Sequence, residues 1–219
     1  MKFKAILFDC DGVLVDSEPL TCQVLRDMLA EIGWDMTHAE CMAAFVGKTV
    51  REESARIEAH TGRAFSEAWL QDFYQRRNAA LRADLQAIPG AALAVAAAHR
   101  ATQGRIACAS GADRFKVEMV LGQVGLLDYF AGRIFSGHEM PRSKPAPDVY
   151  LAAAAHLNVP PAQCLVIEDT SVGVTAGVAA RATVWAYCPQ PDAGAALLQA
   201  GASRVFADMA DLPQLWFAV

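Results

Sequence analysis

Two aspartates stand two positions apart near the start of the chain, in the run "LFDCDGVLVDSE". Asp9 follows an apolar stretch typical of a buried strand, and Asp11 precedes Gly12. Two like charges at the end of a buried strand repel each other unless a cation offsets them. The spacing therefore indicates either a solvated turn or a site whose chemistry needs both carboxylates.

Other strand-like runs in the sequence also end in polar residues. The run "GRIACAS" ends in Ser110, and "QCLVIED" ends in Glu168 and Asp169. In open α/β sheets, ligands bind outside the carboxyl ends of the strands, so we expect these side chains to converge with Lys144 from the loop "MPRSKPAPD". Several carboxylates in one place require a cation, and hard oxygen ligands favour Mg²⁺. The sequence therefore predicts a magnesium site.

Strand patterns alternate with helical patterns along most of the chain. Strands are expected at 3–9, 104–110, 163–169 and 181–187, with weaker candidates at 132–137 and 203–209. Helices are expected at 113–123, 147–157, 172–180 and 193–200. This alternation predicts an α/β fold with a doubly wound, mostly parallel (Rossmann-like) sheet.

The interval 17–85 interrupts this alternation. It has no convincing strand and several amphipathic helices, one of which places Cys22, Leu25, Leu29 and Ile32 on one face. We therefore expect a helical domain of residues 17–85, inserted into an α/β core made of residues 1–16 and 86–219.

Composition limits the classes of partner and compartment. The 219 residues carry a net charge of -5 with both signs interspersed, which argues against nucleic-acid binding. The apolar run near the start of the sequence is too short for a signal peptide. In the most apolar later stretch, the charged or polar residues His99, Arg100 and Arg105 interrupt the run, so we expect no membrane-spanning segment there. Six cysteines without a CxxC pair indicate a reducing, cytoplasmic setting.

Taken in order, the motifs resemble those of the haloacid dehalogenase-like hydrolase superfamily, in the branch with a helical cap inserted after the first motif. The matching segments are "DCDGVLVDSE", "ASG", "SKPAPDVY" and "IEDTSVGVTAG", and the likeness covers essentially the whole chain. The resemblance implies that residues 17–85 form the cap. It also implies a Mg²⁺-dependent phosphatase acting on a small phosphorylated metabolite, as a monomer or weak homo-oligomer.

The resemblance also assigns roles to individual residues. Asp9 is implied as the nucleophile that becomes an aspartyl-phosphate, and Asp11 as the general acid and then the base. Ser110 and the backbone N–H of Gly111 would bind the phosphate oxygens, and Lys144 would supply positive charge. The implied metal ligands are Asp9, Asp11 (through its carbonyl), Glu168 (directly or through water) and Asp169.

In the cap, three residues are candidates for contact with substrate. Glu18 stands at the start of the cap, where it either begins a helix or meets substrate hydroxyls. Lys48 and Arg51 either bind an anionic or polyhydroxylated substrate or are solvated.

Alternative functions within this resemblance remain open. A phosphonatase would use a cap lysine as a Schiff base, but the motif around Lys48 matches that class poorly. A β-phosphoglucomutase would carry a cap histidine where this chain has Thr21, which favours a phosphatase. The run "IFSGHEMPRSKPAPDVYLAAA" and the terminal "DLPQLW" look most like sugar-phosphate phosphatases, including those that act on 6-phosphogluconate. A non-catalytic module that binds a phosphorylated metabolite or a protein partner is disfavoured by the intact charges.

Overall fold

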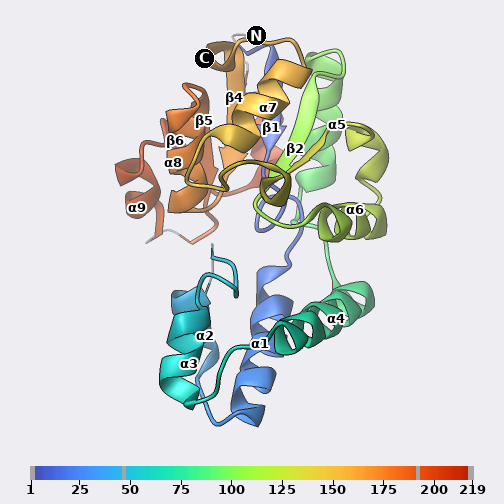
Figure 1. Cartoon of the computed structure of the whole chain (residues 1–219). Helices are drawn as coiled ribbons and strands as arrows, with labels where there is room; N and C mark the ends of the chain where they lie inside the picture. The colour runs from blue at the N-terminus through green and yellow to red at the C-terminus, as the bar shows by residue number, and fades with distance from the viewer. Residues whose placement is uncertain (1–2, 46–47, 191–192, 217–219) are drawn as a thin grey trace. The chain divides into compact units, whose positions relative to one another are not determined.

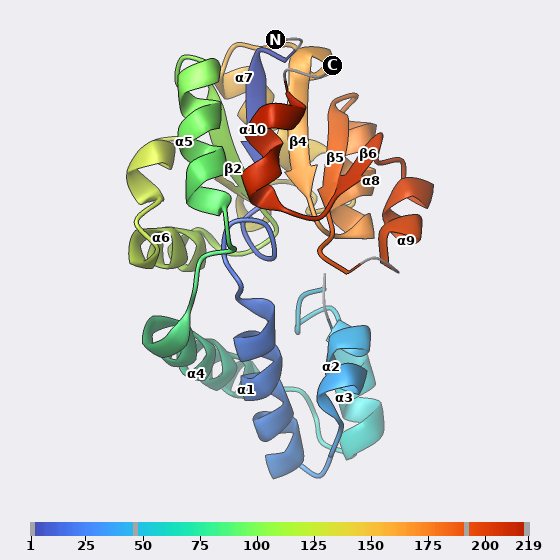
Figure 2. The same cartoon turned by 180° about the vertical axis from the view of Figure 1, so that it is seen from behind.

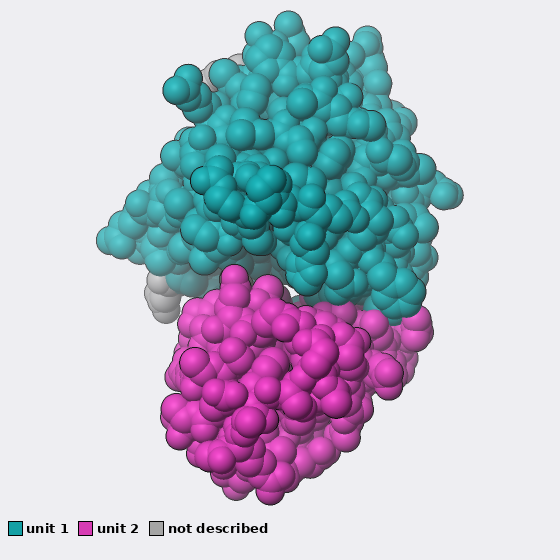
Figure 3. Space-filling view, in the orientation of Figure 1, with its two compact units in different colours: residues 1–16, 86–219 teal, residues 17–85 magenta. Residues whose placement is uncertain are grey.

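The computed structural model describes residues 3–45, 48–190 and 193–216. The chain divides into two compact units, one of Met1–Asp16 and Gln86–Val219 and the other of Ser17–Leu85 (Figure 3). The first is an α/β unit and the second is a helical unit.

The α/β unit contains a six-stranded sheet in which all neighbouring strands are parallel (Figure 1). The strands are β1 (Ala5–Phe8), β2 (Ile106–Ser110), β3 (Ile134–Ser136), β4 (Cys164–Glu168), β5 (Thr183–Tyr187) and β6 (Arg204–Phe206). Their order is β3-β2-β1-β4-β5-β6, so the first strand of the chain lies inside the sheet. The predicted α/β, Rossmann-like fold is confirmed.

Helices cover both faces of this sheet. Figure 1 shows α7 (Asp148–His156) and α8 (Ser171–Ala179) over one face. Figure 2 shows α5 (Ala91–Ala101) and α10 (Leu212–Leu215) over the other. Among the residues described, this unit also contains α6 (Arg114–Gln123), α9 (Gly194–Gln199) and the 3-10 turns η1 (Leu127–Phe130), η2 (Gly137–Glu139), η3 (Pro161–Gln163) and η5 (Met209–Asp211).

The strands form because apolar, often β-branched residues alternate between two buried faces. Leu7, Ala109 and Val166 point to one face, where they join a core with Val149 of α7 and Val174 of α8. Their chain neighbours are buried on the opposite face. Burial on both sides explains why the strands read as continuous apolar runs.

The register of the sheet brings the strand ends to one edge. Phe8 of β1 lies opposite Cys108 of β2 and Ile167 of β4. The Asp9 N–H, one residue past β1, donates to the Ile167 carbonyl at 2.9 Å. Asp9 therefore leaves the sheet beside the ends of its two neighbouring strands.

In the described residues 17–45 and 48–85, the helical unit has four helices around its own core. They are α1 (Glu18–Glu31), α2 (His38–Phe45), α3 (Ser54–Thr61) and α4 (Glu67–Asp84). Leu25 and Leu29 of α1 pack in this core with Leu70 and Phe73 of α4. The Ser66 hydroxyl caps α4 by accepting from the Trp69 N–H at 3.1 Å. The amphipathic spacing predicted for α1 is therefore seen, with Ile32 at the half-buried end of the stripe.

Neither a membrane span nor a disulfide is found. Among the residues described, none of the helices combines the length and the apolar character needed to cross a bilayer. All six cysteines are buried free thiols.

Candidate active site

Lys144 connects the ends of β1 and β4. Its Nζ donates to Asp9 Oδ1 at 2.5 Å and to Glu168 Oε1 at 2.7 Å. The three side chains are at most 10% exposed, so water screens this triad poorly. The ammonium also lies 4.9 Å from the centre of the Tyr150 ring. The loop lysine predicted from sequence is therefore a buried cation between two carboxylates.

Burial and charge set the protonation of this triad. Burial raises the pKa of Asp9 to about 7, against the opposing effect of the Lys144 ammonium. Burial disfavours charged Lys144, but Asp9 and Glu168 together raise its pKa well above the ordinary value. Burial also disfavours ionised Glu168, but Lys144 and hydrogen bonds from Thr170 and Tyr150 lower its pKa. At neutral pH, Asp9 is the member of the triad closest to its titration point, and a further cation favours its carboxylate.

Glu168 is held by hydrogen bonds on both carboxylate oxygens. Oε1 accepts from Lys144 and, at 2.9 Å, from Tyr150 Oη. Oε2 accepts from the Asp169 N–H at 2.9 Å and from the N–H and hydroxyl of Thr170, both at 3.1 Å. These bonds use the lone pairs that a carboxylate offers. Glu168 therefore anchors Lys144 and the turn from β4 into α8.

Gly173 of α8 leaves the space that the Glu168 carboxylate fills, because a Cβ there would overlap that carboxylate. Although alanine ordinarily stabilises a helix relative to glycine, we expect Gly173→Ala to lower the free energy of unfolding by about 1–3 kcal/mol. The matched control is Gly122→Ala in α6, whose methyl group meets only Leu127 Cδ2 at 3.8 Å and which should leave stability equal or slightly higher. Urea denaturation measures both, and equal stabilisation by the two substitutions would contradict this packing argument.

Three carboxylates could hold a metal ion at this edge. Oxygen atoms of Asp9, Glu168 and Asp169 lie within 4.8 Å of one another. Gly12, with φ of 75°, makes room for this group because a Cβ there would overlap the Asp169 carboxylate. The all-oxygen donor set fits Mg²⁺. Among the described residues this cluster does not include the Asp11 carboxylate, which has a different partner.

That partner is Lys116, which the sequence analysis did not single out. Its Nζ donates to Asp11 Oδ1 at 2.7 Å, and the two side chains are 8% and 15% exposed. The sequence feature that could have pointed to Lys116 is its place on the buried face of α6, next to Val117 and one turn before Val120. A lysine at such a position requires a buried partner.

The loop after β2 is shaped by its own hydroxyl groups. Ser110, 1% exposed, accepts the Ala112 N–H on its Oγ at 3.0 Å. Ser136 of β3 donates to the Ala112 carbonyl at 2.6 Å. Because Ser110 Oγ is an acceptor here, its own proton can serve a ligand oxygen. The Gly111 N–H, predicted as a phosphate ligand, lies within this loop.

Comparison with known proteins decides the family. The family model described as haloacid dehalogenase-like hydrolase matches residues 3–181. The chain belongs to the haloacid dehalogenase-like hydrolases. Its resemblance to this family, read from four short motifs, is confirmed.

Several members of this family resemble the chain over most of its length. The 6-phosphogluconate phosphatase of Escherichia coli (strain K12) is 27% identical over 99% of this chain and 96% of its own. Hexitol phosphatase B of the same strain is 32% identical over 81% of this chain and 80% of its own. The crystal structure of a HAD family hydrolase from Deinococcus radiodurans R1, with bound phosphate and sodium, has 36% identity and a TM-score of 0.78. It covers 96% of this chain and 93% of that one.

The three candidate substrate contacts Glu18, Lys48 and Arg51 belong to the helical unit, whereas the carboxylate cluster belongs to the α/β unit. Lys48 Nζ pairs with Glu53 at 2.9 Å, and Arg51 pairs with Glu67 at 2.7 Å. Glu18 is the first residue of α1. The two cations are thus bound to acidic neighbours of their own unit.

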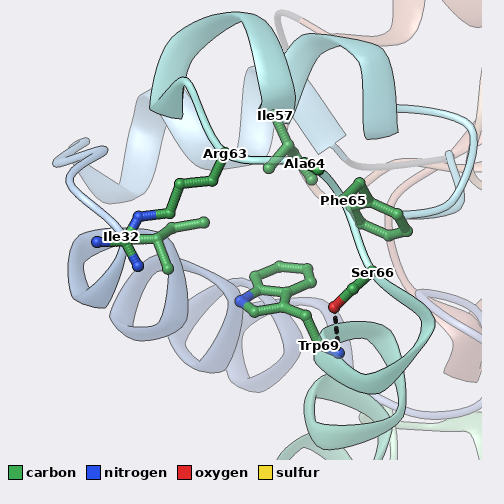
Figure 4. A pocket seen from close by; sticks show the side chains of 7 residues that line it. All are labelled: Ile32, Ile57, Arg63, Ala64, Phe65, Ser66 and Trp69. Atoms are coloured by element: carbon green, nitrogen blue, oxygen red, sulfur yellow. Dashed lines mark hydrogen bonds between the residues drawn. The ribbon is translucent and has the colours of Figure 1, made fainter.

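A pocket of about 210 Å³ is also contained in the helical unit of this hydrolase (Figure 4). Figure 4 shows it between Arg63 and Trp69, and Ser66 bonds the Trp69 N–H at its rim. No residue of the sequence-predicted site lines it. The carboxylate cluster, rather than this pocket, is the candidate site.

Proposed function

We propose that the protein is a Mg²⁺-dependent phosphatase that releases inorganic phosphate from small sugar or sugar-acid phosphates. The observation that carries the proposal is the buried Asp9 carboxylate, bonded to Lys144 and grouped with Glu168 and Asp169 at the edge of the sheet. A carboxylate next to fixed positive charge is suited to attack phosphorus.

The reaction proceeds in two displacements. First, an Asp9 oxygen bonds to phosphorus as the ester P–O bond breaks, and Asp11 gives its proton to the leaving oxygen. Next, a water oxygen bonds to phosphorus while Asp11 takes a proton from that water. The bond between Asp9 and phosphorus then breaks, which frees inorganic phosphate and restores both carboxyl groups.

Mg²⁺ fits the charge of this site. Lys116 and Lys144 face the carboxyl groups of Asp9, Asp11, Glu168 and Asp169. With all four ionised two formal negative charges remain, and with Asp11 protonated, as the first displacement requires, one remains. When bound, Mg²⁺ would supply positive charge to the phosphate oxygens. Asp9, Asp169 and the Asp11 carbonyl are the proposed ligands. Glu168 is proposed to act through water because hydrogen bonds already occupy both of its oxygens.

To catalyse phosphoryl transfer, the protein must position the phosphate oxygens and stabilise their negative charge. We assign this to the Ser110 hydroxyl, the Gly111 N–H and Lys144. The bond that Ser110 Oγ accepts from the Ala112 N–H holds the oxygen in place and leaves its own proton available to a phosphate oxygen. Such preorganised donors lose little entropy when the transition state forms.

The substrate class rests on the similarity to phosphatases named for 6-phosphogluconate and hexitol phosphates. Residues 17–85 are the proposed cap, and Glu18, Lys48 and Arg51 its proposed substrate contacts. Release of the ion pairs with Glu53 and Glu67 would make Lys48 and Arg51 available to an anionic or hydroxylated substrate. We place the enzyme in the cytoplasm, as a monomer or weak homo-oligomer.

The test is phosphate release from a panel of sugar, sugar-acid and polyol phosphates. We expect turnover with Mg²⁺ and a loss of roughly 100-fold after chelation with EDTA, restored by added Mg²⁺. The restoration is the control that separates metal loss from denaturation.

Other outcomes would support other functions. Binding of these esters without turnover at saturating Mg²⁺ would establish a binding module. Conversion of β-glucose 1-phosphate to the 6-phosphate without phosphate release would establish a mutase. Cleavage of a carbon–phosphorus bond in a phosphonate would establish a phosphonatase.

A further inference from the structure

Lys116 is a buried lysine to which the two proposed displacement steps assign no role. It is 6% exposed and lies in the first turn of α6, where the helix dipole disfavours a cation. Its ion pair with Asp11 at 2.7 Å offsets both the dipole and the loss of hydration. The buried position of Lys116 in α6 therefore depends on its ion pair with Asp11.

The backbone that carries Lys116 is fixed at several points. The Asp113 carboxylate caps α6 by accepting the Lys116 N–H at 2.8 Å. Arg114 joins the same turn to Glu139 through two bonds of 2.6 Å and to the Ile134 carbonyl at 2.8 Å. Val117 packs in the core directly after Lys116. The ammonium therefore extends from a rigid base toward Asp11.

The two aspartates Asp9 and Asp11 are each paired with a different lysine. Lys144 bonds Asp9, and Lys116 bonds Asp11. Asp11 stands in a turn in which the Gly12 N–H donates to the Val15 carbonyl at 2.9 Å, which fixes the backbone but not the side chain. The ion pair with Lys116 restrains that side chain.

We propose that Lys116 is a positioning residue that holds the Asp11 carboxyl group in place for proton transfer. This inference rests on the proposed function. Lys116 does not touch the phosphate; it acts through Asp11, and proton transfer by a misplaced Asp11 is slower.

The first test separates binding from catalysis in Lys116→Met. With an alkyl phosphate substrate and saturating Mg²⁺, we expect kcat to fall roughly 10- to 100-fold while KM stays nearly unchanged. With a nitrophenyl phosphate, whose leaving group needs little protonation, the loss should be smaller. Lys116→Arg, which keeps the charge, should recover part of kcat.

The second test is a double-mutant cycle. If Lys116 acts through Asp11, Lys116→Met should cause no further loss in an Asp11→Asn background. Glu118→Gln is the matched control, because it removes an ion pair with Arg114 on the same helix and should leave kcat unchanged. If Lys116→Met does not fold, Lys116→Gln takes its place in the cycle.

The outcomes distinguish the inference from the function on which it rests. A wild type without turnover on the whole phosphate panel would overturn the proposed function. An active wild type whose Lys116→Met loss is additive with Asp11→Asn would overturn the positioning role alone. A rise in KM at constant kcat would also overturn it, because Lys116 would then bind substrate.

Discussion

Asp9→Asn should lower phosphate release by roughly 10³-fold or more, with the protein still folded. Asparagine has nearly the shape of aspartate, but its amide is a poor nucleophile toward phosphorus. Phosphate release in the presence of Mg²⁺ measures the loss. Asp128→Asn, at an exposed position of η1, is the matched control and should keep full activity.

Measuring the stability of Asp9→Asn shows whether activity is lost because the carboxylate is missing or because the protein unfolds. In the wild type, burial raises the pKa of Asp9 to about 7, so folding favours its protonated form. That contribution is full below the unfolded pKa and is lost as pH rises through about 7. Without metal, Asp9→Asn should therefore gain stability relative to wild type as pH rises. Activity within tenfold of wild type would rule out Asp9 as nucleophile.

Lys144→Met should destabilise the protein by about 3–5 kcal/mol and remove most activity. The substitution keeps an unbranched side chain one atom shorter than lysine but leaves Asp9 and Glu168 buried without their shared cation. Thermal or urea denaturation in EDTA measures the change. Lys4→Met, at an exposed position, is the control and should change stability little.

The loss in free energy of unfolding caused by Lys144→Met should depend on pH. Without the ammonium, burial raises the pKa of both carboxyls, so the folded variant favours their protonated forms. Stability is then lost as pH rises from the unfolded carboxyl values of about 4 through the raised folded values. The difference from wild type should therefore be larger at about pH 8 than at about pH 5. A constant difference would indicate lost packing rather than unpaired charge.

The sheet and the strand-end residues could be predicted because they follow from chain-local rules. Apolar runs alternating with helices imply a parallel sheet, and parallel strands end at one edge. Asp9, Ser110 and Glu168 therefore could be grouped before their distances were known. Strand ends differ by a residue or two from expectation, as in β4, which spans Cys164–Glu168.

Three features of the site could not be obtained in this way. Lys116 is on a helix, so the rule about strand ends does not point to it, and its contact with Asp11 spans a long stretch of sequence. The bonds that hold Glu168 come from Tyr150 and Thr170 as well as Lys144, and they depend on how α7 and α8 pack. The structure also places the Asp169 carboxylate against Gly12, a contact that the spacing of the first motif does not reveal.

The place of β1 inside the sheet has a consequence for how the chain matures. During synthesis β1, which leads to Asp9, emerges before its hydrogen-bonding neighbours β2 and β4, which lie much later in the chain. Such a high contact order slows folding and leaves apolar residues exposed in the nascent chain. The surroundings of Asp9 are therefore complete only after β4 has been synthesised.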